Sequence, residues 1–210
     1  MRAIALLLTG AGLAACATTP PVPTTAASQV LARAETVPVA TGGNADAADD
    51  PAIWRNRADP AASLIVATDK KAGLHVYGID GKSRSFDPAG RLNNVDLVEL
   101  ADGRVLVAAS DRNDLTAARL RLYWLAPDGK LAPYGTVAGG AGEAYGLCLW
   151  QSGGAVFAFS VLKDGTVEQV QLDLAPDAPR GAIVRSLRVP TQSEGCVVDP
   201  RSQTLFVGEE

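Results

Sequence analysis

The chain has 210 residues, of which 47% are hydrophobic and 20% charged, and its formal net charge is −4. These values are ordinary for a globular domain with a sizeable hydrophobic core. Because the chain has no polybasic segment and no excess of positive charge, we expect no nucleic-acid partner.

Residues 1–15 have the pattern of a bacterial lipoprotein signal peptide. Arg2 supplies the positive charge, residues 3–8 are apolar, and the segment LAAC at 13–16 ends in small residues and a cysteine. We therefore predict cleavage before Cys16, lipidation of that cysteine, and a lipid anchor in a membrane of the cell envelope. Ala17 stands where inner-membrane lipoproteins carry an aspartate, which favours the outer membrane. A plain signal peptide with an incidental cysteine is the alternative, and the apolar run is too short for a spanning helix.

Residues 16–35 predict a flexible tether, because they are rich in Thr and Pro and have no hydrophobic periodicity. The folded domain is predicted to begin at residue 36 and to run to residue 210.

Short apolar segments with alternating side chains predict β-strands throughout that domain. They lie at residues 64–67, 74–77, 105–108, 120–124 and 156–159. Asp-Gly pairs at 80–81, 102–103, 128–129 and 164–165 predict two-residue hairpin turns, since this pair tolerates positive φ at both turn positions. No segment after the leader has a convincing helical pattern, so the predicted fold class is all-β.

A longer repeat predicts a β-propeller. Polar segments open an apolar strand roughly every 45 to 50 residues, which is the repeat length expected of propeller blades. These segments are Asp49-Asp50, Asn94-Val95-Asp96, Glu143-Ala144-Tyr145-Gly146 and Ser193-Glu194-Gly195. Because the first strand of each blade begins beside the central channel, we expect the polar groups to converge at one end of that channel.

Carboxylates at these blade starts predict a metal site. They include Asp49, Asp50, Asp96, Glu143 and Glu194, with Glu209 and Glu210 at the end of the chain. Gathered carboxylates repel one another unless cations lie among them. Oxygen ligands without paired histidines or thiolates favour calcium over zinc. The alternative for any single acid is a solvated loop residue.

Basic residues alternate with these acids along the chain. Lys70 and Lys71 follow one predicted strand, Arg112 follows another, and Lys163 follows a third. Cations beside a metal site suit a phosphate-rich anion. The Lys-Lys pair taken alone also fits a solvated turn.

Cys148 and Cys196 lie in strand-like apolar runs of a domain predicted to be exported. An oxidising compartment permits a disulfide between them. Two buried free thiols are an equally good interpretation of the sequence.

Seven segments carry a resemblance to the β-propeller phytases: DAADDPAIW, TDKKAGLHVYGIDGK, LNNVDL, AASDR, EAYGLCLW, SEGCVVD and LFVGEE. The resemblance extends from about Thr36 to Glu210 and matches the N-terminal portion of the family. It implies a six-bladed β-propeller that binds several calcium ions. It also implies a 3-phytase-type phosphoric monoester hydrolase, which converts phytate (myo-inositol hexakisphosphate) to lower inositol phosphates and phosphate by direct attack of a metal-activated water.

The resemblance also implies roles for individual residues. Asp50 and the carbonyl of Val95 correspond to ligands of a structural calcium, and Asp49 and Glu194 to ligands of calcium at the channel mouth. Glu194, Glu210 and Tyr145 are thereby expected to act in catalysis. The substrate phosphates are expected to contact Tyr145 and four basic residues, which are Lys70, Lys71, Arg112 and Lys163.

Other phosphatase chemistries lack their residues in this sequence. His75 is the single histidine, and its place in an apolar strand indicates a structural role, which excludes histidine-nucleophile and imidazole-ligated dinuclear enzymes. A cysteine phosphatase needs a Cys-x5-Arg loop, but Ser202 stands where that arginine would follow Cys196. Ser152 lies in WQSG, so the Gly-x-Ser-x-Gly elbow is also absent.

The length of the chain departs from the family pattern. About four blade starts are present, the last blade is incomplete, and we expect the sequence to be that of a C-terminally truncated phytase. For the chain itself we keep the alternative of an inactive fragment. Two other functions stay open, namely a non-catalytic envelope propeller that binds calcium or anions and a propeller phosphoesterase acting on another phosphoester.

Overall fold

The computed structural model describes residues 29–39, 46–175 and 177–209. The described residues from Arg33 onward belong to one compact unit. Its described part contains fourteen β-strands and one short 3-10 helix, Pro60–Ala62. The predicted all-β fold class is therefore confirmed. None of the described residues forms a helix with the length and hydrophobicity that a membrane crossing requires. The predicted leader and Cys16 lie outside the described residues.

The strands form three four-stranded sheets and one two-stranded sheet, and each sheet is an antiparallel meander in chain order. The first sheet contains β1 (Ala48–Trp54), β2 (Leu64–Asp69), β3 (Gly73–Gly78) and β4 (Ser83–Asp87). The second contains β5 (Leu92–Glu99), β6 (Val105–Asp111), β7 (Ala117–Leu125) and β8 (Leu131–Ala141). The third contains β9 (Ala144–Ser152), β10 (Ala155–Leu162), β11 (Thr166–Asp173) and β12 (Arg180–Arg188). The fourth contains β13 (Ser193–Asp199) and β14 (Thr204–Glu209).

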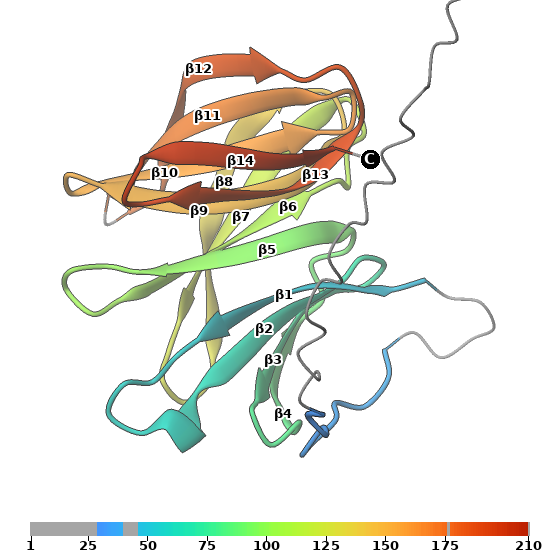
Figure 1. Cartoon of the computed structure of the whole chain (residues 1–210), viewed down its shortest axis with the longest axis vertical. Helices are drawn as coiled ribbons and strands as arrows, with labels where there is room; N and C mark the ends of the chain where they lie inside the picture. The colour runs from blue at the N-terminus through green and yellow to red at the C-terminus, as the bar shows by residue number, and fades with distance from the viewer. Residues whose placement is uncertain (1–28, 40–45, 176, 210) are drawn as a thin grey trace, which may run out of the picture. The chain divides into compact units, whose positions relative to one another are not determined.

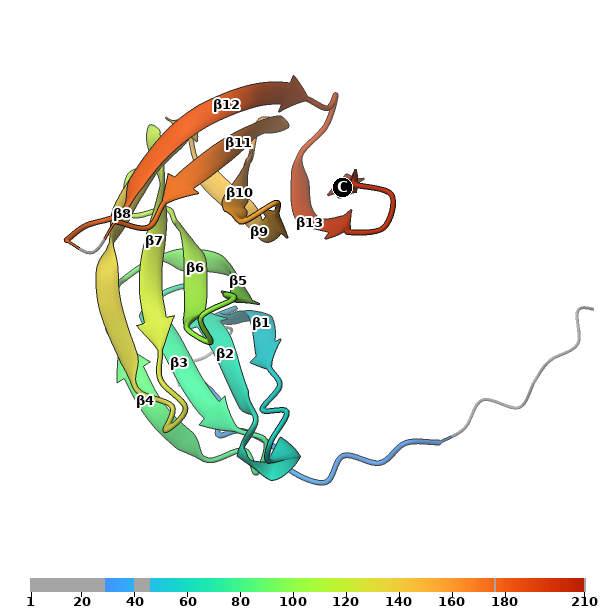
Figure 2. The same ribbon diagram turned by 90° about the vertical axis from the view of Figure 1, so that its left-hand side faces the viewer.

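The first strands of successive sheets lie next to one another. β1 contacts β5, β5 contacts β9, and β9 contacts β13 (Figure 1). Figure 2 shows these four strands on one side of the sheets and the last strands, β4, β8 and β12, on the other. This is the arrangement of successive propeller blades, and the four predicted blade starts lie at or directly before β1, β5, β9 and β13. The propeller prediction is confirmed, with three complete blades and a two-stranded fourth sheet among the described residues.

Alternating side chains of each middle strand fill the space between sheets. On β6, Val107 packs into the core between the first and second sheets, and its neighbour Leu106 packs into the core between the second and third. Every residue of β6 is buried, which explains the continuous apolar sequence of its first five residues, 105–109. Burial of a Leu or Val side chain contributes about 1.5 to 3 kcal/mol, so these two cores hold consecutive blades together.

The hairpin turns differ from the predicted two-residue type. Gly81, Gly103 and Gly129 have positive φ, but among the described non-glycine residues only Gln203 does. The N–H of Gly81 donates to the carbonyl of Gly78 at 2.9 Å, and the N–H of Gly78 donates to that of Lys82 at 2.9 Å. This is a three-residue loop ending in a glycine bulge. The turn prediction was therefore wrong in type, because each aspartate accepts hydrogen bonds from the backbone instead of adopting positive φ.

A disulfide joins the third and fourth sheets. Cys148 on β9 and Cys196 on β13 are bonded, with their Cα atoms 5.6 Å apart. The structure therefore decides between the two interpretations of these cysteines in favour of the bridge. Phe159, Val161 and Val198 pack around it in a third hydrophobic core.

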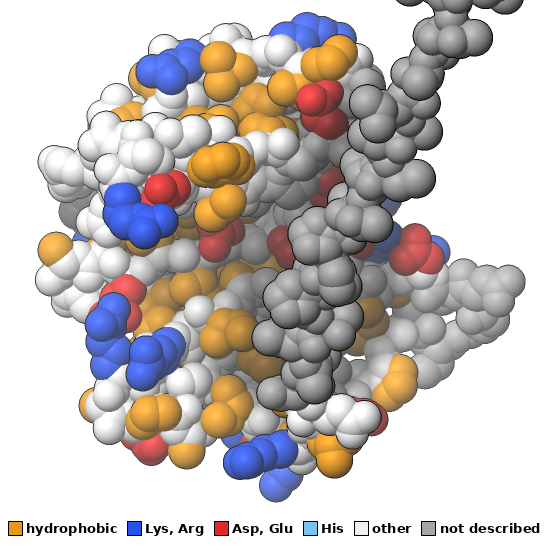
Figure 3. Space-filling view, viewed as in Figure 1, with side chains coloured by type: hydrophobic (Ala, Val, Ile, Leu, Met, Phe, Trp, Pro, Cys, Tyr) orange, Lys and Arg blue, Asp and Glu red, His pale blue; other side chains and the backbone are white. Residues whose placement is uncertain are grey.

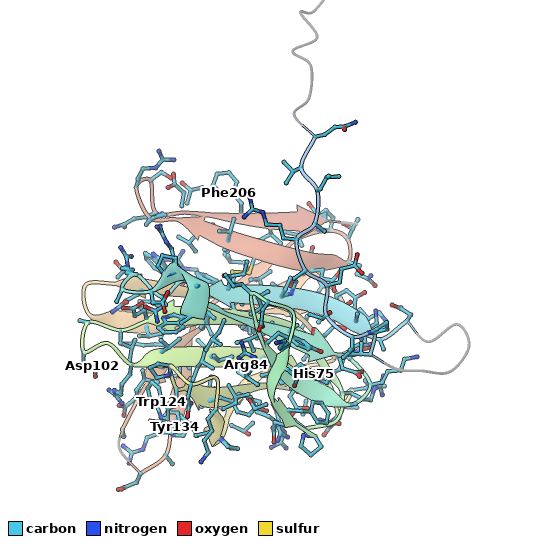
Figure 4. The ribbon with its side chains drawn as sticks, turned by 90° about the horizontal axis from the view of Figure 1, so that it is seen from below. His75, Arg84, Asp102, Trp124, Tyr134 and Phe206 are labelled. Carbon is cyan, nitrogen blue, oxygen red and sulfur yellow. A yellow bond between two sulfur atoms is a disulfide. The ribbon has the colours of Figure 1, made fainter. Side chains whose placement is uncertain are left out.

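The fourth sheet leaves large apolar side chains in solvent. Val197 is 59% exposed and Phe206 is 56% exposed. Figure 4 labels Phe206 on this hairpin, and Figure 3 shows hydrophobic side chains over the region of β12 to β14. Neighbouring β12 is exposed along its whole length and carries three arginines. Charged side chains of this kind discourage pairing of an edge strand with another chain.

Candidate active site

Acidic and basic side chains meet at one end of the sheets because the strands are antiparallel. The start of each first strand lies beside the end of the second strand of the same sheet. The predicted acids lie at the starts of the first strands, and the predicted cations lie at the ends of the second strands. Lys70 and Lys71 follow β2, Arg112 follows β6, and Lys163 follows β10.

Two buried aspartates hold the backbone that carries the first three of these cations. The Oδ1 atom of Asp69 accepts hydrogen bonds from the N–H groups of Lys71 at 3.0 Å and Ala72 at 3.1 Å. In the next sheet, the Oδ1 atom of Asp111 accepts from the N–H of Asn113 at 2.9 Å. Because these acids close the turns, the basic side chains start from a fixed backbone.

A hollow of about 450 Å³ gathers the predicted substrate-binding residues. Its lining consists of Asp46, Lys70, Lys71, Arg91, Arg112, Tyr145 and Lys163. All four predicted cations and Tyr145 are therefore brought together. Sequence reasoning missed Arg91, whose carbonyl accepts a hydrogen bond from the N–H of Arg112 at 3.0 Å. The one feature of the sequence that could have identified Arg91 is its place directly before the first strand of a blade.

Tyr145 lies between two cations of this hollow. The guanidinium carbon of Arg112 is 5.4 Å from the centre of the tyrosine ring, and the ammonium of Lys163 is 5.5 Å from it. Attraction between a cation and an aromatic face holds such groups together. The carbonyl of Tyr145 also accepts a hydrogen bond from the hydroxyl of Ser110 at 2.7 Å, which ties β9 to β6 of the preceding sheet.

Glu143, which the sequence grouped with the metal-binding acids, contacts two basic side chains. Its carboxylate accepts a hydrogen bond from the Nη2 atom of Arg112, and its Oε2 atom lies 3.8 Å from the ammonium of Lys163. The structure therefore places Glu143 with the predicted phosphate-binding residues.

Asn93 is a second residue that sequence reasoning missed. Its side chain is buried, and its Nδ2 atom donates to Glu194 at 2.8 Å and to Asn94 at 2.8 Å. Its Oδ1 atom accepts from Nη1 of Arg112 at 2.7 Å. Asn93 thus links the predicted catalytic acid on β13 with a predicted phosphate-binding residue that follows β6. Its signal was present in LNNVDL, where sequence reasoning used only the residues after it.

Gly146 permits the close approach of β13 to β9. A Cβ atom at this position would lie 1.7 Å from the backbone oxygen of Glu194. No side chain fits there without movement of one strand, so the glycine allows the backbone of Glu194 to lie this close to β9.

The predicted calcium ligands Asp50 and Val95 meet each other. The Oδ2 atom of Asp50 accepts a hydrogen bond from the N–H of Val95 at 3.0 Å. Burial raises the pKa of the Asp50 carboxyl. Burial also raises the pKa of Asp96, and the charge of Asp50 adds to that rise.

Asp49 lies in a different environment. It forms an ion pair with Lys70 at 3.1 Å, and the same ammonium lies 2.9 Å from Asp46. The hydrogen bond from Lys70 to Asp46 is the main reason that the pKa of Lys70 is raised.

These acids fit only part of a calcium site. No group of three or more His, Cys, Asp or Glu side chains is placed to hold a metal within residues 29–39, 46–175 and 177–209. In that same part of the chain, no ion pair joins Asp50 or Asp96 to a lysine or arginine. Two half-buried carboxylates without an organic cation have the oxygen chemistry that calcium prefers. The calcium roles of Asp49, Asp50, Val95 and Glu194 stay predictions, and Glu210 lies outside the described residues.

Propeller sheets with a basic hollow at their blade starts define a β-propeller protein suited to bind a phosphate-rich anion. The sequence model of the phytase family matches residues 2–210. The 3-phytase of Bacillus subtilis (strain 168) is 36% identical over 193 residues, and the match covers 87% of this chain and 50% of that protein. The chain therefore belongs to the phytase family, which confirms the resemblance. It spans about half the length of the curated relative that it matches.

Proposed function

We propose that this protein hydrolyses phytate to lower inositol phosphates and phosphate, with calcium as its cofactor. The observation that carries the proposal is the convergence of Lys70, Lys71, Arg112, Lys163 and Tyr145 in one hollow of a phytase-family chain. Phytate carries six phosphate groups, so a hollow lined by several cations suits it better than it suits a neutral substrate.

The basic side chains bind the phosphate oxygens in this proposal. Arg112 offers a planar guanidinium that can donate two parallel hydrogen bonds, and the lysines supply compact charges. The hydroxyl of Tyr145 can donate one further hydrogen bond. Charge on the oxygens around phosphorus grows during the reaction, so the same groups also stabilise the transition state.

Calcium completes the site through Asp49, Asp50, the carbonyl of Val95 and Glu194 in this proposal. A calcium ion held there would supply positive charge that offsets the polyanion and would favour attack of water on phosphorus. Glu194 and Glu210 are the proposed catalytic acids. Asn93 orients Glu194 through its hydrogen bond at 2.8 Å.

Direct attack by water agrees with the state of the available nucleophiles. His75 stacks on Tyr77 and Phe86 in β3 and β4, and burial lowers its pKa (Figure 4). Cys148 and Cys196 are bonded to each other, so neither offers a thiolate. Within the described residues, the site therefore offers no histidine or cysteine for a covalent intermediate.

The test is release of inorganic phosphate from phytate by the purified protein, with calcium or with a chelator. We expect release that needs calcium and collapses in Glu194→Gln. The control is Glu99→Gln, because Glu99 is exposed, lies at the other end of β5 and accepts a hydrogen bond from the Nε1 atom of Trp54, away from the hollow. Equal release by Glu194→Gln and the unsubstituted protein would refute the role of Glu194. Phytate binding without any release would favour the non-catalytic binding propeller instead.

We also propose that Cys16 carries a lipid that anchors the protein to the outer membrane. The support is the leader pattern in residues 1–16. Membrane fractionation and mass spectrometry test it, since Cys16→Ser should abolish the lipid and the membrane association. An unmodified N-terminus at another residue would contradict it.

A further inference from the structure

Glu143 lies where it can contact residues that follow two different strands, β6 and β10. It directly precedes β9, and its carbonyl accepts a hydrogen bond from the N–H of Lys163 at 3.1 Å. Its side chain is 19% exposed, and it contacts two residues that line the hollow, Arg112 and Lys163.

Both of its partners are basic residues of the hollow. Arg112 reaches Glu143 from the end of β6 in the neighbouring sheet, and Lys163 reaches it from the end of β10. Both cations also contact the ring of Tyr145. The second hydrogen bond of the Arg112 guanidinium goes to Asn93, so its plane is held from two sides.

An acid in this place opposes anion binding by its charge alone. A phosphate entering the hollow meets the field of Glu143 as well as that of the cations. Long Lys and Arg side chains, however, lose rotamer freedom when they bind a ligand, and a group that already holds them reduces that loss. The two effects have opposite signs, which makes them separable by experiment.

We propose that Glu143 is a positioning residue that holds Arg112 and Lys163 in the geometry for binding phosphate, and that it strengthens anion binding despite its negative charge. The inference rests on the proposed function, because it concerns the phosphate groups bound at that same site. It assigns Glu143 no contact with the substrate and no part in calcium binding.

Asp46 provides a matched comparison within the same hollow. It also pairs with a cation of the hollow, Lys70, at 2.9 Å. Its side chain is 78% exposed, and Asp49 holds the same ammonium at 3.1 Å. Removal of the Asp46 charge therefore still leaves the Lys70 ammonium paired with Asp49.

The experiment is calorimetric titration of the full chain with inorganic phosphate. Glu143→Gln should weaken phosphate binding by about tenfold, whereas Asp46→Asn should strengthen it by about twofold because only repulsion is removed. If charge alone governed both positions, both substitutions would strengthen binding. Phosphate affinity in Glu143→Gln equal to or above that of the unsubstituted chain would overturn the proposal.

A double-mutant cycle tests whether Glu143 acts through its two partners. In a background of Arg112→Ala with Lys163→Ala, the Glu143→Gln substitution should no longer weaken binding. The same tenfold loss in that background would refute a positioning role. Glu143→Asp keeps the charge with a shorter side chain, so it should fall between Gln and Glu and serves if Glu143→Gln fails to fold. Phosphate binding by Glu143→Asp as tight as that of the unsubstituted chain would count against the proposal.

Binding of phosphate needs no turnover, so the inference and the proposed function can fail separately. One result is weaker phosphate binding in Glu143→Gln with no phytate hydrolysis by the unsubstituted protein. This result would support the positioning role and refute the proposed enzymatic activity. Hydrolysis of phytate with an unchanged KM in Glu143→Gln would remove the positioning role and leave the enzyme. No measurable phosphate binding by the unsubstituted chain would also overturn the inference.

Discussion

The two ends of the sheets use the same residue types in different ways. At the end opposite the hollow, arginines pair with aspartates of their own hairpin, as Arg84 does with Asp80 and Arg104 with Asp102. Figure 4 labels Arg84 and Asp102. At the blade starts, polar contacts join different sheets. Asp50 on β1 accepts from Val95 on β5, and Asn93 on β5 donates to Glu194 on β13. The hairpin contacts stabilise one turn each, whereas these contacts at the blade starts join different blades, as the hydrogen bond from Trp54 to Glu99 also does at the opposite end.

Two aspartates in hairpin turns differ in pKa from two at the blade starts. Backbone hydrogen bonds lower the pKa of Asp80 and Asp102 in their exposed turns. Burial raises the pKa of Asp50 and Asp96. An ionised Asp80 or Asp102 therefore favours folding, whereas an ionised Asp50 or Asp96 opposes it unless a cation binds.

Loss of the disulfide should have the largest effect, because it removes a covalent link between blades. The bond closes a loop with a sequence separation of 48 residues between Cys148 and Cys196. The chain-entropy estimate for a loop of that size is about 4 kcal/mol of stability. Thermal denaturation of Cys148→Ser with Cys196→Ser, or of the reduced chain, should show a lower Tm. An unchanged Tm after complete reduction would contradict the dependence on contacts between blades.

Two glycine substitutions should separate spacing between blades from turn geometry. Gly146→Ala places a Cβ against the backbone of Glu194 and should cost about 3 kcal/mol, with weaker phosphate binding as well. Gly103 has φ of 83°, and a Cβ atom added there would meet no other atom within 4 Å, so Gly103→Ala should cost about 1 kcal/mol through strain alone. Denaturant unfolding measures both. If the two substitutions changed phosphate affinity equally, the proposed difference between the blade starts and the hairpin turns would be contradicted.

Substitution of Asp50 and Asp102 should change stability in opposite directions. Because the folded-state pKa of Asp50 is raised, the native state loses stability as pH rises through that pKa. Without calcium, Asp50→Asn should therefore gain stability over the unsubstituted chain between about pH 4 and pH 7. The folded-state pKa of Asp102 is lowered, so its contribution is present at neutral pH and is lost as pH falls through that pKa. Asp102→Asn should accordingly be slightly less stable at neutral pH.

Calcium provides the second arm of this experiment. Calcium should raise the Tm of the unsubstituted chain and of Asp102→Asn by several degrees, and Asp50→Asn should lose most of that response. Thermal scans with calcium and with a chelator measure it. Equal calcium responses in the two variants would mean that Asp50 is a buried acid without a metal role.

The strands and the blade starts could be predicted because both depend on local patterns. Alternation identified the strand of Val107, and the repeated polar segments located the starts of β1, β5, β9 and β13. The turn type was wrong, since a bond from the backbone to the aspartate side chain competes with positive φ. The disulfide stayed undecided in the sequence, because β9 and β13 meet only once the blades are stacked.

Site residues followed the same rule. The cations and Tyr145 were identified from motifs, and the structure gathers them in one hollow. The roles of Glu143 and Asn93 escaped prediction because each depends on a partner in another sheet. Contacts between blades have no signature in a single sequence, whereas turns and strands do.

The most direct test of the account is the affinity of the chain for phytate with calcium present, measured by calorimetric titration for two arginine variants. Arg112 lies in the hollow at the blade starts, and Arg104 lies in a hairpin turn beside Asp102 and Trp124. The account predicts that Arg112→Ala weakens phytate binding by about tenfold or more, the loss expected for a charged hydrogen bond, and that Arg104→Ala leaves it unchanged. Equal affinities for phytate in both variants and the unsubstituted chain would contradict it.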